Sequence, residues 1–376
     1  MGSVSRVLAA AAMVLTLCGG CSTRPSQGVL VPVAESAEGT SRVPVLAVTT
    51  RRKSTTDVGE MFNGERAEDV SFAAVTVSIP PDSVRKIGEI QWPASPPGDP
   101  RHDFVTVSAN YLDKQSFNTA LTAATKQAGH GKVLVFVHGF NNRFDDAVYR
   151  FAQIAHDSKA QAIPVLFTWP SRGEVELRAY TYDRDSATYS RDALEQLMDT
   201  LARQPSVTEV TILAHSMGNW VTLEALRSMS IRSSRIGDKI KNVMLVAPDV
   251  DVDIFRTQIV RMGTIRPRFE LFVSQDDRAL GLSKFIWGGV PRLGEVDPNT
   301  EPYRSQFQQQ RIVVFNLTKL KSPGDDAHDR AFEDITSVAA MVRKRLHEGQ
   351  QMAEPHGNAL LSTGSTTAEA ERNASK

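Results

Sequence analysis

Along the second part of the chain, apolar residues follow two spacings in turn, that of a buried strand and that of an amphipathic helix. The run KVLVFV at 132–137 is continuous and rich in β-branched residues, which is typical of a strand buried on both faces. In the stretch that follows, Phe144, Val148, Phe151 and Ile154 fall on one helical face. The pattern therefore predicts a buried strand followed by an amphipathic helix.

The same change of period recurs towards the C-terminus. Strands are predicted at 165–169, 209–214, 242–247, 269–274 and 311–317, and helices at 192–203, 219–229 and 332–346. Strands and helices that alternate in this way indicate an α/β fold, in which a mostly parallel central sheet is covered by helices on both faces.

The stretch before the first of these strands has a less regular pattern. Three apolar runs, at 43–49, 70–80 and 104–109, are predicted to be strands separated by Pro-rich turns. We expect them to extend the sheet antiparallel at one edge. Since no linker separates them from the rest, the sequence predicts one folded domain over 43–348.

The N-terminus has the pattern of a secretory signal over 1–20. Arg6 precedes an apolar run, VLAAAAMVLTL, that is too short to span a bilayer. The following LCGGCS resembles the lipobox of bacterial lipoproteins, in which the cysteine, here Cys21, is lipidated and becomes the new N-terminus. Cys18 stands where Leu is more usual, so cleavage of a plain signal peptide is the alternative.

Polar segments flank the predicted domain. Residues 21–42 are rich in Ser, Pro, Gly and Glu and are expected to be a flexible tether, and 349–376 a disordered tail. Ser22 follows the predicted lipidation site, and by resemblance to lipoprotein sorting in Gram-negative bacteria it favours the outer membrane. We therefore expect a lipid-anchored periplasmic protein of the bacterial envelope.

Composition narrows the classes of function. Lys and Arg together number 43, as do Asp and Glu, so there is no net basic field to attract nucleic acid. The chain has neither an H-E-x-x-H zinc motif nor a phosphate-binding G-x-x-x-x-G-K loop. No metal or cofactor is expected, and no nucleic-acid partner.

The stretch ILAHSMGNW, at 212–220, carries the strongest chemical signal. An apolar strand ends at a turn containing Ser216, and a helix begins beyond it, which is the setting of the nucleophile elbow in α/β-hydrolases. Small residues are needed where strand and helix approach closely, and Ala214 and Gly218 supply them. The alternative is a serine that only caps the helix.

A serine nucleophile needs a base, and the base needs an orienting acid. In α/β-hydrolases the chain order is serine, acid, histidine. The acid should follow the second strand after the elbow, where Asp276 and Asp277 stand, and we prefer Asp277. Asp249, after the intervening strand, is a rival that we expect to support the site or cap a helix. His328 is the histidine between the last predicted strand and the final helix, and it is the predicted base.

Acyl transfer also needs donors for the developing oxyanion. One is normally the amide after the nucleophile, here that of Met217. The second is expected from the loop VHGFNN after an earlier strand, where the glycine allows the amide of Phe140 to point at the site. His138 and His215 are expected to be buried structural residues.

Seven motifs together resemble a bacterial family of esterase/lipase-like α/β-hydrolases without an assigned function. They are VLAVTTR (45–51), MFNGER (61–66), VHGFNN (137–142), TWPSRG (168–173), AHSMGN (214–219), APD (247–249) and DDRAL (276–280). The resemblance implies the α/β-hydrolase fold and a Ser-His-Asp site, and it brings no settled substrate.

The main hypothesis is a serine hydrolase that cleaves carboxylic esters of small molecules or lipids. Its alternatives are a non-catalytic binding module on the same scaffold, and an acyltransferase or lipase acting on envelope lipids. Two stretches, 168–190 and 281–306, are expected to shape access to the site. In the second, residues 285–287 form either an apolar flap or part of a core helix.

Overall fold

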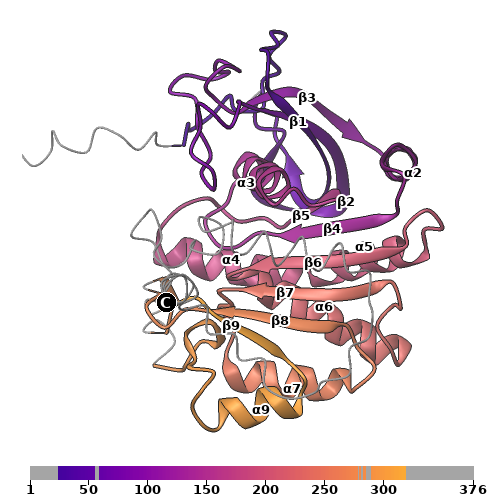
Figure 1. Cartoon of the computed structure of the whole chain (residues 1–376), viewed down its shortest axis with the longest axis vertical. Coiled ribbons are helices and arrows are strands. Elements are labelled where there is room, and N and C mark those ends of the chain that lie inside the picture. Colours follow the sequence, from indigo (N-terminus) through magenta and orange to yellow (C-terminus); the bar gives the residue numbers. More distant parts are fainter. Residues whose placement is uncertain (1–23, 56–58, 278, 281–282, 285–288, 319–376) are drawn as a thin grey trace, which may run out of the picture.

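A nine-stranded sheet lies at the centre of the part of the chain that the computed structural model describes (Figure 1). The described residues are 24–55, 59–277, 279–280, 283–284 and 289–318. The strands are β1 (Ser41–Lys53), β2 (Phe62–Ile79), β3 (Val105–Leu112), β4 (Lys132–Val137), β5 (Ile163–Thr168), β6 (Glu209–His215), β7 (Ile240–Val246), β8 (Arg268–Val273) and β9 (Val313–Asn316).

The strand order is β3-β2-β1-β5-β4-β6-β7-β8-β9. Neighbouring strands are parallel throughout the part of the sheet that runs β1-β5-β4-β6-β7-β8-β9. Strand β2 pairs antiparallel with both β1 and β3. The predicted antiparallel extension at one edge of a parallel sheet is confirmed.

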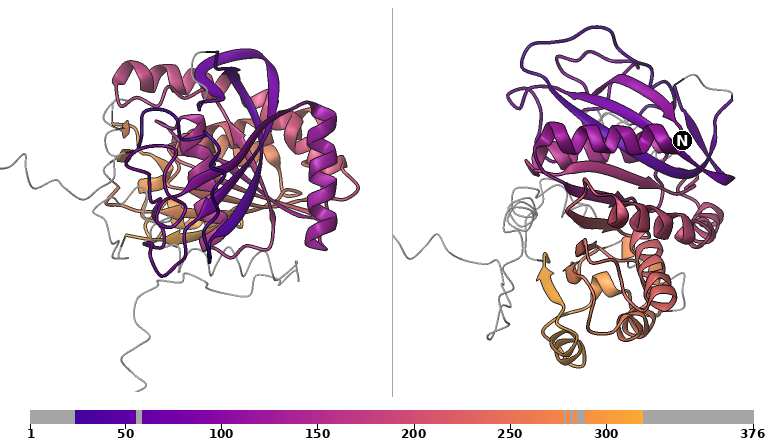
Figure 2. Two further views of the ribbon diagram at one scale, coloured as in Figure 1. Left: turned by 90° about the horizontal axis from the view of Figure 1, so that it is seen from above. Right: turned by 90° about the vertical axis from the view of Figure 1, so that its right-hand side faces the viewer.

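Helices cover both faces of the sheet (Figure 2). They are α2 (Lys114–Ala128), α3 (Phe144–Asp157), α4 (Leu177–Tyr189), α5 (Arg191–Arg203), α6 (Gly218–Ser233), α7 (Val252–Met262) and the short α9 (Tyr303–Gln309). The apolar residues of α2, α5, α6 and α7 pack on one face, and those of α3 pack on the other. Among the described residues no helix is both long and apolar enough to cross a membrane.

Two of the helices without a predicted counterpart are α2 and α4. The stretch 168–190 is expected to be a loop, yet α4 occupies most of it, and α2 lies in a stretch without a predicted element. Both bury few side chains: Phe117, Leu121 and Thr125 on α2, and mainly small or polar residues on α4. So narrow an apolar stripe gives little helical periodicity in the sequence. The predicted helix at 332–346 lies outside the described residues.

Strand β4 shows why the central runs are continuously apolar. Val133, Val135 and Val137 face the core shared with α5 and α6, and Leu134 and Phe136 face the core shared with α3. All five side chains are at most 1% exposed. Burial on both faces removes the polar alternation of a one-sided strand.

The N-terminal segment 24–40 packs on the domain. Val29 and Leu30 are each 1% exposed and belong to the core beside α3. The carbonyl of Val29 accepts a hydrogen bond from the Tyr149 hydroxyl at 3.1 Å. Within the predicted tether 21–42, Val29 and Leu30 therefore pack on the core, because a short apolar stretch in a polar segment is enough to bind it there.

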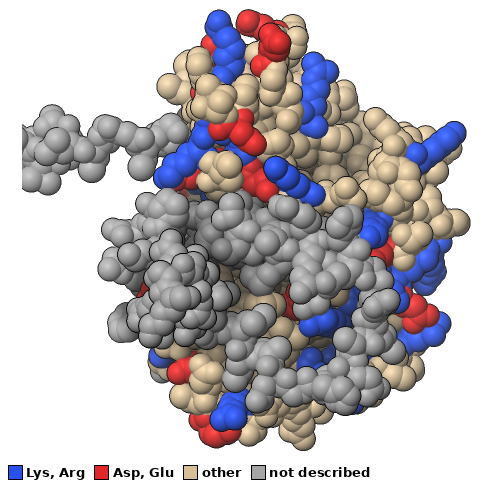
Figure 3. All heavy atoms as spheres, in the orientation of Figure 1, with Lys and Arg blue, Asp and Glu red and all other residues tan. Residues whose placement is uncertain are grey.

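Acidic and basic side chains are interspersed on the face shown in Figure 3. Many charged side chains of the described residues form local pairs, such as Arg101 with Asp99 at 2.7 Å and Arg203 with Asp199 at 3.2 Å. Exposed pairs of this kind contribute little to stability. Because the two kinds of charge are mixed, the described part of the face in Figure 3 has no large area of a single charge sign.

The packing of the N-terminal segment predicts a stability effect. Leu30→Ala should lower the free energy of unfolding by about 2–4 kcal/mol, because it removes a buried side chain and leaves a cavity. Leu177→Ala is a matched control, since Leu177 is 63% exposed, and should change that free energy by less than about 0.5 kcal/mol. Urea denaturation measures both, and equal effects would contradict the packing.

Candidate active site

Five loops meet at the edge of the sheet where the parallel strands end. They are 138–142 after β4, 169–173 after β5, 216–217 after β6, 247–249 after β7 and 274–277 after β8. In open α/β sheets this carboxyl edge is where ligands bind. Four of the five predicted site residues lie here: Phe140, Ser216, Met217 and Asp277.

Ser216 occupies a strained turn between β6 and α6. Its φ is 50°, in the left-handed region that a side-chain-bearing residue adopts at a cost. The turn is fixed from both sides, because Ser216 donates its amide to the carbonyl of Val246 at 3.0 Å and accepts the amide of Asn219 at 3.1 Å. The hydroxyl therefore sits on a turn that the surrounding hydrogen bonds hold in an unfavourable conformation.

Two glycines allow the β4 loop to contact this turn. A Cβ on Gly218 would lie 2.4 Å from the carbonyl oxygen of His138, and one on Gly139 would lie 2.8 Å from the Cβ of Ser216 and 3.1 Å from the ring of His215. Contacts this short exclude any side chain. The start of the loop after β4 is thereby held against the turn at Ser216.

The two predicted oxyanion donors lie on either side of this contact. Neither the amide of Phe140 nor that of Met217 donates a hydrogen bond to another described residue. The ring of Phe140 packs edge-on against Tyr180, with centroids 5.3 Å apart. Two amides near a serine that have no acceptor among the residues the structure describes are compatible with an oxyanion site.

Arg51 holds the loop 139–142, which contains the predicted oxyanion donor Phe140 and is called the oxyanion loop below. Its side chain is buried and donates to the carbonyl of Asn142 at 2.6 Å, the carbonyl of Ser171 at 2.9 Å and the hydroxyl of Thr168 at 2.9 Å. Burial lowers the pKa of Arg51 to about 10, so the guanidinium stays charged at neutral pH. The sequence predicts no role for Arg51, although it ends the first of the family motifs.

Asp183, on α4, holds the same loop from the other side. It is fully buried and accepts hydrogen bonds from the Ser171 hydroxyl, from the amide of Arg172 at 2.8 Å and from that of Asn141 at 3.4 Å. Burial raises the pKa of Asp183 to about 6. The sequence contains no signal for this carboxylate, because the helix that carries it has little apolar periodicity.

His138 is structural, as predicted. It is 1% exposed and stacks on Trp169 with ring centroids 4.8 Å apart. Its Nδ1 faces the carbonyl of Gly139 at 2.8 Å and must carry the proton, because a carbonyl can only accept. Its Nε2 accepts from the amide of Trp169 at 3.2 Å. Burial first, and then the charge of Arg51, lower the pKa of His138 well below its usual range, so the ring is neutral.

The two adjacent acid candidates point in different directions. Asp277 is 2% exposed, and its carboxylate accepts the amide of Leu280 at 3.0 Å. Asp276 is exposed and accepts the hydroxyl of Ser274 at 2.6 Å. Only Asp277 of this pair is turned into the protein, which favours it over its neighbour as the orienting acid.

The rival Asp249 already holds several partners. One carboxylate oxygen accepts the Tyr180 hydroxyl and the other the Ser283 hydroxyl, each at 2.6 Å. Its amide donates to the carbonyl of Ser216 at 3.3 Å. The start of α7 is capped by Asp251 and not by Asp249. Asp249 therefore ties α4 and the segment after β8 to the elbow.

Three predictions that concern the site and its anchor fall outside the described residues. They are the base His328, the lipidation site Cys21 and the apolar stretch 285–287. Each stays a prediction from the sequence.

One cluster has the composition of a metal site. Asp82, His156 and Asp157 lie close enough together to share an ion. However, Arg85 forms ion pairs with both carboxylates, and Asp157 also accepts the amide of Gln153 at 2.8 Å. A guanidinium already supplies the positive charge, so this cluster fastens a loop to α3.

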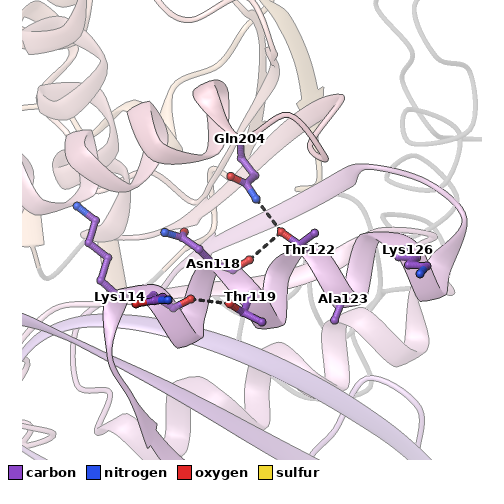
Figure 4. Close-up of a pocket in the computed structure, with 8 residues that line it drawn as sticks. Lys114, Asn118, Thr119, Thr122, Ala123, Lys126 and Gln204 are labelled. Carbon is purple, nitrogen blue, oxygen red and sulfur yellow. Dashed lines mark hydrogen bonds between the residues drawn. The ribbon is translucent and has the colours of Figure 1, made fainter.

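A groove of about 720 Å³ lies along α2, away from the predicted site (Figure 4). Its lining residues are Lys114, Gln115, Asn118, Thr119, Thr122, Ala123, Lys126 and Gln204. Several bond to one another or to the helix backbone, as Gln204 does to Thr122 at 2.8 Å. None of the predicted site residues lines it.

The carboxyl of Asp183 predicts a pH effect on stability. Its pKa of about 6 in the folded chain exceeds the value of about 3.9 expected when unfolded, so the folded chain binds this proton more tightly. The stabilisation is fully present below about pH 4 and is lost as the pH rises through about 6. Asp183→Asn should remove this decline, which amounts to about 3 kcal/mol.

Urea denaturation at several pH values between 4 and 7 measures this change. Asp185→Asn, at an exposed position of the same helix, is the control and should keep the decline. Parallel profiles for the two variants would contradict the role assigned to Asp183.

Comparison with known proteins assigns the chain to a family. The family model for an alpha/beta hydrolase of unknown function (DUF900) matches residues 113–345. No curated protein matches the chain.

Solved structures resemble the chain at low identity. An uncharacterized protein from Bacillus cereus is 11% identical with a TM-score of 0.36, and the match covers 58% of this chain and 60% of that one. An esterase from Rhizomucor miehei is 11% identical with a TM-score of 0.33, over 74% and 81% of the two chains. A siderophore hydrolase from Aspergillus nidulans is 11% identical with a TM-score of 0.35, over 83% and 97%. The chain belongs to the DUF900 family of α/β-hydrolases and has the mostly parallel sheet of that fold.

Proposed function

We propose that the protein is a serine hydrolase that cleaves carboxylic esters and is tethered in the bacterial envelope. The observation that carries the proposal is Ser216 on a strained turn, at φ 50°, beside two amides that have no acceptor among the described residues. Strain concentrates at functional positions, where the surrounding structure maintains it.

The reaction proceeds through an acyl-enzyme. The hydroxyl oxygen of Ser216 attacks the ester carbonyl while His328 takes the hydroxyl proton, and the amides of Met217 and Phe140 bind the oxyanion. The tetrahedral intermediate collapses, and His328 returns the proton to the leaving alcohol. Water, deprotonated by His328, then releases the acid and restores the serine. Asp277 keeps the imidazole oriented throughout.

The tether is the lipidated Cys21 that the sequence predicts. The substrate is an ester of a small molecule or a lipid, and the hydrolysis draws only on side chains, backbone amides and water. The support for an ester, as opposed to an amide, is the resemblance of the sequence motifs to esterase/lipase-like α/β-hydrolases, so the choice of substrate class is part of the proposal.

Removal of the nucleophile tests the mechanism. Ser216→Ala should reduce kcat for p-nitrophenyl butyrate by at least about a thousandfold, since the triad acts as a unit. Circular dichroism and the thermal midpoint should show an intact fold. Ser305→Ala, an exposed serine on α9, is the control and should keep full activity.

Two outcomes would contradict the proposal. One is equal turnover by the Ser216→Ala variant and the unmodified chain. The other is the absence of turnover by a well-folded unmodified chain over a series of acyl chain lengths, which would favour the non-catalytic binding module.

A further inference from the structure

The N-terminal segment reaches the loops that border the site. The guanidinium of Arg24 donates to the carbonyl of Asn141 at 2.9 Å and to its side-chain oxygen at 3.0 Å. It also donates to the carbonyl of Gly173, in the loop after β5. Since Asn141 follows Phe140, the segment contacts the residue next to a proposed oxyanion donor.

Further contacts fix the path of the segment. Arg24 forms an ion pair with Asp146 in the first turn of α3. Arg143 donates to the carbonyls of Pro25 and Ser26, each at 2.6 Å. Side chains of the segment and of the domain therefore hold the segment at the border of the site. Arg24 is the residue of the segment that contacts the site loops.

Chain length places the proposed anchor close to this point. Three peptide units separate Cys21 from Arg24. Consecutive Cα atoms are about 3.8 Å apart, so these two Cα atoms lie within about 11 Å of each other. A lipid on Cys21 would therefore bring the bilayer surface to the border of the site, with no long spacer between them.

The same border exposes two large apolar side chains. Val175 is 77% exposed and Leu177 is 63% exposed, and both follow Gly173, which Arg24 contacts. The charged side chains among them cancel, being Arg172, Glu174, Glu176 and Arg178. This stretch, 172–178, carries two positive and two negative side chains and is called the rim below. Exposed aliphatic side chains without net charge suit the interfacial region of a bilayer more than a polar partner.

We infer that the rim docks on the membrane that holds the Cys21 anchor, and that the site takes an acyl ester of a membrane lipid from it. This inference rests on the proposed hydrolase function and anchor. Lipid binding at the rim would present an ester to Ser216 from the bilayer surface, with the oxyanion loop held in place by Arg24.

The test compares one substrate in water with one in a membrane. The full chain is reconstituted in vesicles of phosphatidylethanolamine and phosphatidylglycerol that contain a trace of a fluorogenic phospholipid ester. The double variant Val175→Asp with Leu177→Asp should hydrolyse this lipid at least tenfold more slowly than the unmodified chain. Its hydrolysis of p-nitrophenyl butyrate should stay within twofold. An Asp at Leu177 lies in the first turn of α4 and suits a helix N-terminus.

The matched control is Val260→Asp with Ile265→Asp. These two side chains are 60% and 79% exposed but lie at and beyond the end of α7. The control should hydrolyse both substrates at the unmodified rate.

Each of the other possible outcomes contradicts a stated part of the proposal. Equal lipid hydrolysis by the two double variants, or equal losses on both substrates, would overturn membrane docking of the rim and favour a protein partner or damage to the site. An unmodified chain that hydrolyses only the soluble ester would overturn the lipid substrate while leaving the hydrolase intact. If it hydrolyses neither ester, the proposed function itself fails.

Discussion

The buried guanidinium of Arg51 is the interaction on which the geometry of the site depends. It binds the carbonyls of Asn142 and Ser171 and the hydroxyl of Thr168, and so joins β1 to the loops after β4 and β5. Burial of a charge is costly, and here backbone carbonyls and a nearby carboxylate, Asp183, compensate it. Loss of this guanidinium would leave several buried carbonyls without donors.

Preorganisation of the oxyanion loop follows from this arrangement. Arg51 holds Asn142, Asp183 holds the amide of Asn141, and Arg24 holds the carbonyl of Asn141. In the proposed mechanism, a loop fixed in this way lets the amide of Phe140 bind the oxyanion without rearrangement, which is the main way in which such sites lower a barrier. The turn that carries Ser216 is also held in advance. Ser216 keeps its unfavourable φ because hydrogen bonds fix both sides of the turn.

The sequence predicts the sheet well because its strands are continuous apolar runs, such as 132–137, bounded by turns. The elbow is predictable for a related reason, since it combines a strand, a small-residue turn and a helix within nine residues. The role of Arg51 is not predictable, because its partners are carbonyls that any sequence supplies. The packing of 24–40 also escaped prediction, because Val29 and Leu30 are few among polar neighbours. Contacts between residues far apart in the sequence produce no local pattern from which they could be predicted.

The central claim is that Ser216 is an activated nucleophile. The most direct measurement is mass spectrometry of the full chain after reaction with a fluorophosphonate, followed by peptide mapping of the adduct. The account predicts one adduct per chain, on the peptide that contains Ser216, and no adduct in the Ser216→Ala variant. An adduct on another serine, such as Ser283 beside Asp249, or no adduct on a folded chain, would contradict it.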